Sequence, residues 1–67
     1  MTAMPIIDVS LVAGRSETEL RSLIAAVHEA VVTSLGVPGE SVRVLVRELP
    51  PTHWAANDET IAERRTR

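Results

Sequence analysis

Few side chains in this sequence could move a proton, because cysteine, lysine and tyrosine are absent. The residue that stands out is Pro5, which follows Met4 at the head of an apolar run. If translation starts at Met4 and that methionine is removed, Pro5 carries a free secondary amine. The reference pKa of an α-amine is about 8, and an apolar pocket with nearby arginines would lower it towards neutrality. Such a group suits general acid/base catalysis. The alternative is a proline that simply opens an edge strand.

Two arginines could bind carboxylates. Arg15 follows Gly14 at the end of a predicted strand, and Arg43 lies near the start of another, on the face opposite its valines. A guanidinium group holds a carboxylate through two parallel hydrogen bonds and stays charged at any relevant pH. The alternatives are a solvated turn residue for Arg15 and, for Arg43, an intersubunit ion pair with Glu48 or Asp8.

Trp54 is the only aromatic residue, and it follows two prolines and His53. It could line a pocket or anchor a subunit contact, although core packing is a strong alternative. We interpret His53 as a surface residue and His28 as a boundary residue of the helix. Two isolated histidines without any cysteine predict no metal site.

Three elements should position these residues. Alternation of apolar and polar residues predicts strands over 5–12 and 41–49. An apolar stripe predicts a helix from Glu17 to Leu35, with a capping box at Ser16 and Glu19 and a stop at Gly36. The fold class is therefore α/β: a βαβ unit with parallel strands. Asn57-Asp58 suggests a turn, and 55–67 would be a short hairpin or tail.

Size and composition predict association. With 67 residues the chain forms one domain at most, and such short chains expose much of their surface. Two strands do not make a stable sheet alone, so two units should pair into a four-stranded sheet with two helices on one face. The apolar content of 45% exceeds what one small core needs and indicates subunit interfaces.

Charge and hydropathy limit the kinds of partner that we expect for this chain. A net charge of −2 gives no electrostatic reason to expect nucleic acid or a membrane surface. No apolar run approaches the roughly 20 residues that span a bilayer, and the N-terminus lacks the pattern of a signal peptide. We expect a cytoplasmic protein.

Taken in order, these features resemble the 4-oxalocrotonate tautomerase family over nearly the whole chain from Pro5. The resemblance is carried by the following pieces: PII from Pro5, GRS from Gly14, the helix ending at Ser34-Leu35, SVRV from Ser41, and His53-Trp54. It implies a small tautomerase-like domain assembled as a homohexamer, a trimer of dimers, without metal or organic cofactor.

The resemblance also implies roles for individual residues. Pro5, as the amino-terminal residue, would shuttle a proton in keto–enol isomerisation of an unsaturated dicarboxylic 2-oxo acid. Arg15 would bind the distal carboxylate of this substrate. Arg43, from a neighbouring subunit, would hold the 2-oxo or 2-hydroxy group and its carboxylate. Trp54 would form an aromatic wall of the pocket.

Three departures from the family pattern are visible. Residues 1–4 precede Pro5, and we expect them to be a leader or an extension. As long as they remain attached, the Pro5 nitrogen is an amide without useful basicity. Ala55-Ala56-Asn57-Asp58 stands where the family often has a glycine-rich hairpin, and Ala13 replaces a common acidic residue.

Two other functions fit the same fold. One is a non-catalytic subunit of a hetero-oligomeric tautomerase, in which Pro5 is blocked. The other is a hydratase or dehalogenase of the same superfamily, which needs a carboxylate to activate water near the aromatic wall. Ala55 and Ala56 offer none there, which disfavours the hydratase or dehalogenase.

Overall fold

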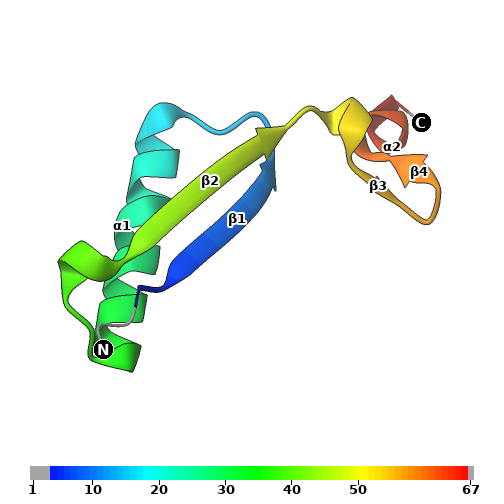
Figure 1. Cartoon of the computed structure of the whole chain (residues 1–67). Helices are drawn as coiled ribbons and strands as arrows, with labels where there is room; N and C mark the ends of the chain where they lie inside the picture. The colour runs from blue at the N-terminus through cyan, green and yellow to red at the C-terminus, as the bar shows by residue number, and fades with distance from the viewer. Residues whose placement is uncertain (1–3, 67) are drawn as a thin grey trace.

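The computed structural model describes residues 4–66, so most of the predicted leader, residues 1–3, lies outside the described part. Two strands, β1 (Ile6–Val12) and β2 (Arg43–Leu49), pair in parallel, in a register that sets Ile6 opposite Arg43 and Val12 opposite Leu49. The connecting helix α1 (Glu17–Leu35) runs back along one face of the pair (Figure 1). The predicted βαβ unit with parallel strands is confirmed.

Helix α1 begins and ends where the sequence predicts. The Glu19 backbone N–H donates to Ser16 Oγ at 3.1 Å, and the Ser16 N–H donates to Glu19 Oε1 at 3.0 Å, which completes the capping box. At the other end Gly36 adopts φ 65°, a left-handed conformation that glycine takes without a steric penalty. Its N–H donates to the Val32 carbonyl at 2.9 Å.

The second strand starts later than predicted. Gly39–Ser41 forms a short 3-10 turn, η1, so Ser41, which was predicted to begin the strand, lies outside β2. The Ser41 hydroxyl donates to the Pro38 carbonyl at 2.7 Å, and its N–H donates to the same oxygen at 3.0 Å. These local bonds hold Ser41 in the turn, because serine competes well for nearby backbone groups.

The C-terminal part forms a hairpin followed by a helix. After η2 (Pro51–His53), strands β3 (Ala55–Ala56) and β4 (Glu59–Thr60) pair antiparallel, and α2 (Ile61–Thr66) follows. The two linking residues, Asn57 and Asp58, have φ values of 53° and 61°. Asparagine and aspartate tolerate this region better than most residues, so a tight hairpin forms without glycine.

The sequence interpretation of the last residues as strand or tail was incomplete, because α2 is helical. The Glu63 N–H donates to Thr60 Oγ1 at 3.1 Å, and the Thr60 N–H donates to Glu63 Oε1 at 2.8 Å. This reciprocal pair is a second capping box, read in the sequence as Thr60-Ile61-Ala62-Glu63.

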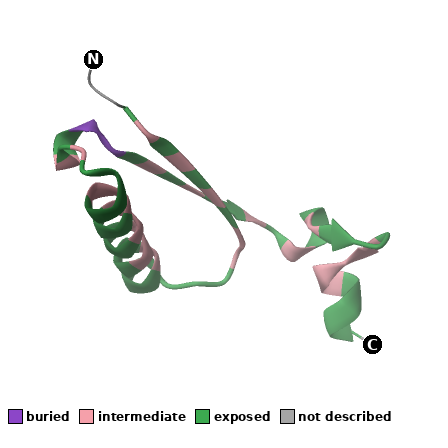
Figure 2. Ribbon diagram, turned by 90° about the horizontal axis from the view of Figure 1, so that it is seen from below, coloured by how far each residue is buried: buried purple, intermediate pink, exposed green. Residues whose placement is uncertain are grey.

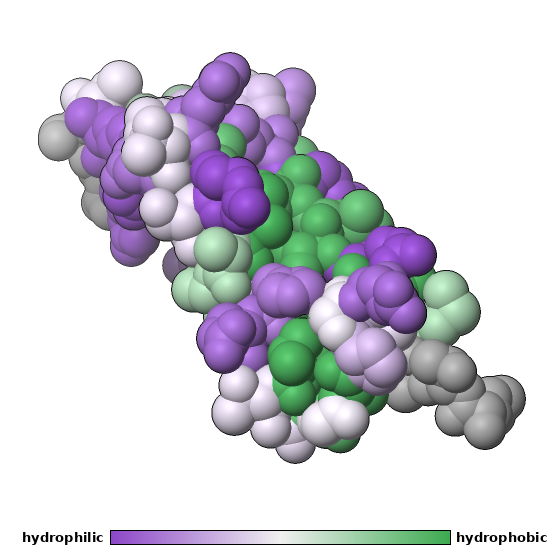
Figure 3. Space-filling view, turned by 90° about the vertical axis from the view of Figure 1, so that its left-hand side faces the viewer, coloured by the Kyte–Doolittle hydropathy of each residue, from purple (hydrophilic) through white to green (hydrophobic). Residues whose placement is uncertain are grey.

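The chain has little core of its own. Val42 is the only buried apolar residue among those described, while Ile6 and Leu45 are 63% and 52% exposed (Figure 2). The radius of gyration is 15.4 Å, against about 11 Å for a compact chain of this length. On the side shown in Figure 3, apolar side chains lie uncovered between polar ones. Across residues 4–66, no helix is long and apolar enough to cross a membrane.

Candidate active site

Two of the predicted site residues lie where β1 and β2 begin. The Arg43 N–H donates to the Pro5 carbonyl at 3.0 Å, which extends the parallel ladder by one bond. The Arg43 guanidinium is directed to backbone oxygens of the preceding turn: Nη1 donates to the Glu40 carbonyl at 2.7 Å and to the Val42 carbonyl at 3.3 Å. Within one chain this group therefore already has partners, which a substrate would have to replace.

The other two predicted residues lie at the opposite end. Arg15 and Trp54 line one cavity, together with Glu19, Arg65 and residues around the end of β1. Arg15 comes from the turn after β1 and Trp54 from the segment after β2, so the parallel strands deliver both to the same end. Trp54 is half-buried and Arg15 is exposed.

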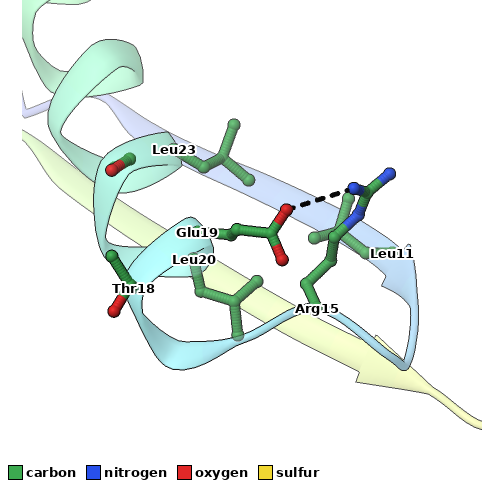
Figure 4. A pocket seen from close by; sticks show the side chains of 7 residues that line it. Leu11, Arg15, Thr18, Glu19, Leu20 and Leu23 are labelled. Atoms are coloured by element: carbon green, nitrogen blue, oxygen red, sulfur yellow. Dashed lines mark hydrogen bonds and ion pairs between the residues drawn. The ribbon is translucent and has the colours of Figure 1, made fainter.

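Arg15 has an acidic neighbour. Its Nη1 lies 3.4 Å from Glu19 Oε2, an ion pair between positions i and i+4 of the chain (Figure 4). The pKa of the Glu19 carboxyl is lowered, first by the hydrogen bond from the Ser16 backbone and then by the Ser16 hydroxyl and the Arg15 charge. Leu11, Leu20 and Leu23 line an apolar cavity that shares this pair.

The two groups of residues are far apart in a single chain. Strand β1 lies between Pro5 and Arg15 and contains seven residues. At about 3.3 Å per residue, a strand of this length spans about 23 Å. One subunit therefore does not bring its own Pro5 and Arg15 together, and a site that used both would need residues from more than one chain.

Sequence reasoning missed two charged residues near Arg15. Glu19 was identified only as a helix cap, and Arg65 was assigned to a solvated tail; both line the cavity of Arg15 and Trp54. The capping box at Thr60 and Glu63 could have revealed the helix that carries Arg65. Within the chain, Asp8 pairs with Arg47 at 3.6 Å. The intersubunit ion pair considered for Arg43 stays a prediction.

Comparison with known proteins shows that the chain is similar to tautomerases. The family model described as tautomerase enzyme matches residues 5–64. A probable tautomerase of Ralstonia nicotianae is 45% identical over 51 residues, which cover 76% of this chain and 73% of that protein. A 2-hydroxymuconate tautomerase of Stutzerimonas stutzeri is 39% identical over 57 residues, 85% of this chain and 90% of that protein.

Solved structures of tautomerase homologues have the same fold as this chain. TomN, a 4-oxalocrotonate tautomerase homologue in the tomaymycin biosynthetic pathway, superposes with a TM-score of 0.92 and 43% identity over 94% of this chain and 97% of its own. A heterohexameric 4-oxalocrotonate tautomerase from Chloroflexus aurantiacus gives 0.86 and 32% over 90% and 97%. The chain belongs to the 4-oxalocrotonate tautomerase family.

Proposed function

We propose that this protein is an isomerase that interconverts the enol and keto forms of an unsaturated 2-oxo or 2-hydroxy dicarboxylic acid. The observation that carries the proposal is the placement of Arg15 and Trp54 in one cavity, with Pro5 and Arg43 at the other end of the same two strands. The similarity to a 2-hydroxymuconate tautomerase supports the substrate class.

The reaction needs one group that accepts and returns a proton. A Pro5 with a free amine takes the proton of the 2-hydroxyl group, the electron pair moves through the conjugated double bonds, and a distant carbon takes the proton back from the same nitrogen. Arg43 holds the 2-oxo group and its carboxylate. Arg15 holds the distal carboxylate and draws electron density towards it, and Trp54 packs against the carbon chain.

Assembly completes each site in this proposal. If two copies pair antiparallel along β1, the Pro5 end of one strand lies beside the Arg15 end of the other. The apolar cavity lined by Leu11, Leu20 and Leu23, and the exposed Ile6, would then be covered. We propose a homohexamer, a trimer of such dimers, acting in the cytoplasm on a small carboxylate substrate.

The test compares two forms of the protein that differ only at the N-terminus. One begins at Pro5, and the other carries a single alanine before Pro5, which converts the amine into an amide. We expect only the first to ketonise 2-hydroxymuconate, followed by ultraviolet absorbance. The blocked form should lose at least about 100-fold in kcat, since general acid/base groups contribute that much or more. Equal rates in both forms would remove Pro5 from the mechanism.

A second candidate is a non-catalytic subunit of a mixed oligomer. It is favoured by the similarity to a heterohexameric relative from Chloroflexus aurantiacus. Mass spectrometry of the protein isolated from its native cells separates the two candidates. A mature terminus at Pro5 in a single-component oligomer supports the enzyme, whereas a blocked Pro5 and a second, related chain support the structural role.

A further inference from the structure

Gly39 has to be small because His28 lies beside it, and not because of its backbone angles. A Cβ atom at position 39 would lie 3.1 Å from His28 Nε2 and 3.3 Å from His28 Cε1. These contacts are tighter than ordinary van der Waals contact, so one of the two groups would have to move by a few tenths of an ångström. The φ of Gly39 is not positive, in contrast to Gly14 and Gly36, where a Cβ atom would meet nothing within 4 Å. Space rather than conformation therefore explains the glycine at position 39.

His28 reaches this position from helix α1. It is half-buried and lines the groove between α1 and β2 together with Ile24, Val42 and Val44. The side chain of Val32, one helical turn later, comes within 4.0 Å of the same Cβ position. The second half of α1 therefore packs against η1, and the His28 imidazole is the nearest part of the helix.

The turn that His28 supports determines where Arg43 lies. The Val42 N–H donates to the Gly39 carbonyl at 3.2 Å, which ties the residue before Arg43 to the turn. The Arg43 side chain is held by the same turn, because its Nη1 donates to the Glu40 carbonyl at 2.7 Å. Both the backbone of Arg43 and the starting position of its guanidinium therefore depend on the placement of η1.

We propose that His28 is a positioning residue for Arg43 and acts through the η1 turn. In this role it touches no substrate. It packs into the room left by Gly39 and fixes the backbone from which the Arg43 side chain extends. The inference rests on the proposed function for the role of Arg43 in holding the substrate. It gives His28, a residue outside the proposed site, an effect on substrate affinity.

Three variants test this role through kcat/KM for the ketonisation of 2-hydroxymuconate. His28→Ala removes the support of η1, and Gly39→Ala pushes the turn and the imidazole apart. A misplacement of 1 Å can cost about 100-fold, so a shift of a few tenths of an ångström should cost about fourfold in each variant. Most of the loss should appear in KM, because Arg43 holds the substrate. Arg21→Ala is the matched control, since Arg21 lines the same groove two helical turns before His28 and should leave kcat/KM unchanged.

The double variant tests the contact itself. In a His28→Ala protein, Gly39→Ala should cost nothing more, because the added methyl group then has room. If the two losses simply multiply, the positions do not act on each other and the inference is overturned. The inference is also overturned if His28→Ala is as active as wild type.

An Arg43→Ala background separates positioning from a general loss of structure. There His28→Ala should cause no further loss, whereas a loosened fold would lower activity in both backgrounds. The same comparison is made on the binding of 2-oxoadipate by titration calorimetry, which requires no proton transfer. Equal effects of His28→Ala with and without Arg43 would refute the inference alone. A protein that binds 2-oxoadipate through Arg43 but ketonises nothing would refute the proposed function alone.

Discussion

Subunit complementation tests whether each site takes Pro5 and Arg15 from different chains. Two inactive variants are needed: one with an alanine before Pro5, and one with Arg15→Ala. Within a chain the two positions are separated by the full length of β1, about 23 Å at the rise of an extended strand. No arginine side chain bridges that span, so a site that used both residues would have to draw on a partner.

The activity that the mixture should recover follows from the fraction of chains that keep each residue. In an equal mixture that assembles at random, half of the chains keep an intact Pro5 and half keep Arg15. If the two residues of a site come from different chains, about a quarter of the sites regain both. The variants are unfolded together in denaturant, refolded, and assayed for ketonisation of 2-hydroxymuconate, with each variant refolded alone as the control. Native mass spectrometry verifies that mixed oligomers form.

A mixture that recovers no activity would refute this reasoning. If mixed oligomers form and the mixture is no more active than the mean of the two variants, no site combines Pro5 of one chain with Arg15 of another. The span of β1 would then be irrelevant to catalysis. Recovery close to a quarter of wild-type activity would instead exclude any site made from a single chain.

Three further predictions concern stability and assembly. Ser16→Ala removes the acceptor for the Glu19 N–H and should lower the free energy of unfolding by about 1 kcal/mol in urea titration. Because folding lowers the pKa of Glu19, its contribution is present above the ordinary value of 4.5 and is lost as pH falls below it. Circular dichroism should therefore show less acid destabilisation in Glu19→Gln than in wild type. Leu45→Asp replaces an exposed apolar side chain of β2 with a charge and should shift sedimentation towards smaller species, whereas an unchanged oligomer would mean that Leu45 is not covered by another copy.

The helix was the most predictable element, because several independent signals coincide at each of its ends. Ser16 and Glu19 mark the start through a reciprocal hydrogen bond, and Gly36 with Pro38 marks the stop. The start of β2 was less predictable. Ser41 belongs to a β-branched run in the sequence, but its local bonds to the Pro38 carbonyl outweigh the strand pattern.

The C-terminal segment was missed for a physical reason. A helix of six residues shows less than two turns of periodicity, so hydrophobic patterning cannot detect it. Only the capping signal at Thr60 and Glu63 was available. Without α2 there was no reason to place Arg65 near Arg15, which are fifty positions apart in the sequence and line one cavity in the structure.

Residue types and positions singled out the candidate site residues and the resemblance supplied their roles, but the pattern along the chain does not show how many chains hold them. A strand pattern shows which residues share a face, yet Pro5 and Arg15 are separated along the strand rather than across it. That separation becomes evident only when the extended length of β1 is compared with the reach of a side chain. From the residues alone the sequence predicted candidate site residues, and only the resemblance placed one of them, Arg43, on a neighbouring subunit.

The geometry that leaves the chain with a weak core would also account for the proposed division of the site between chains. A strand long enough to separate Pro5 from Arg15 also exposes apolar residues that one helix cannot cover, such as Ile6 and Leu45. Pairing with another copy would bury those residues and bring the two ends into contact in one step. If so, folding stability and activity must both rise with protein concentration and share one midpoint, because both depend on the same association.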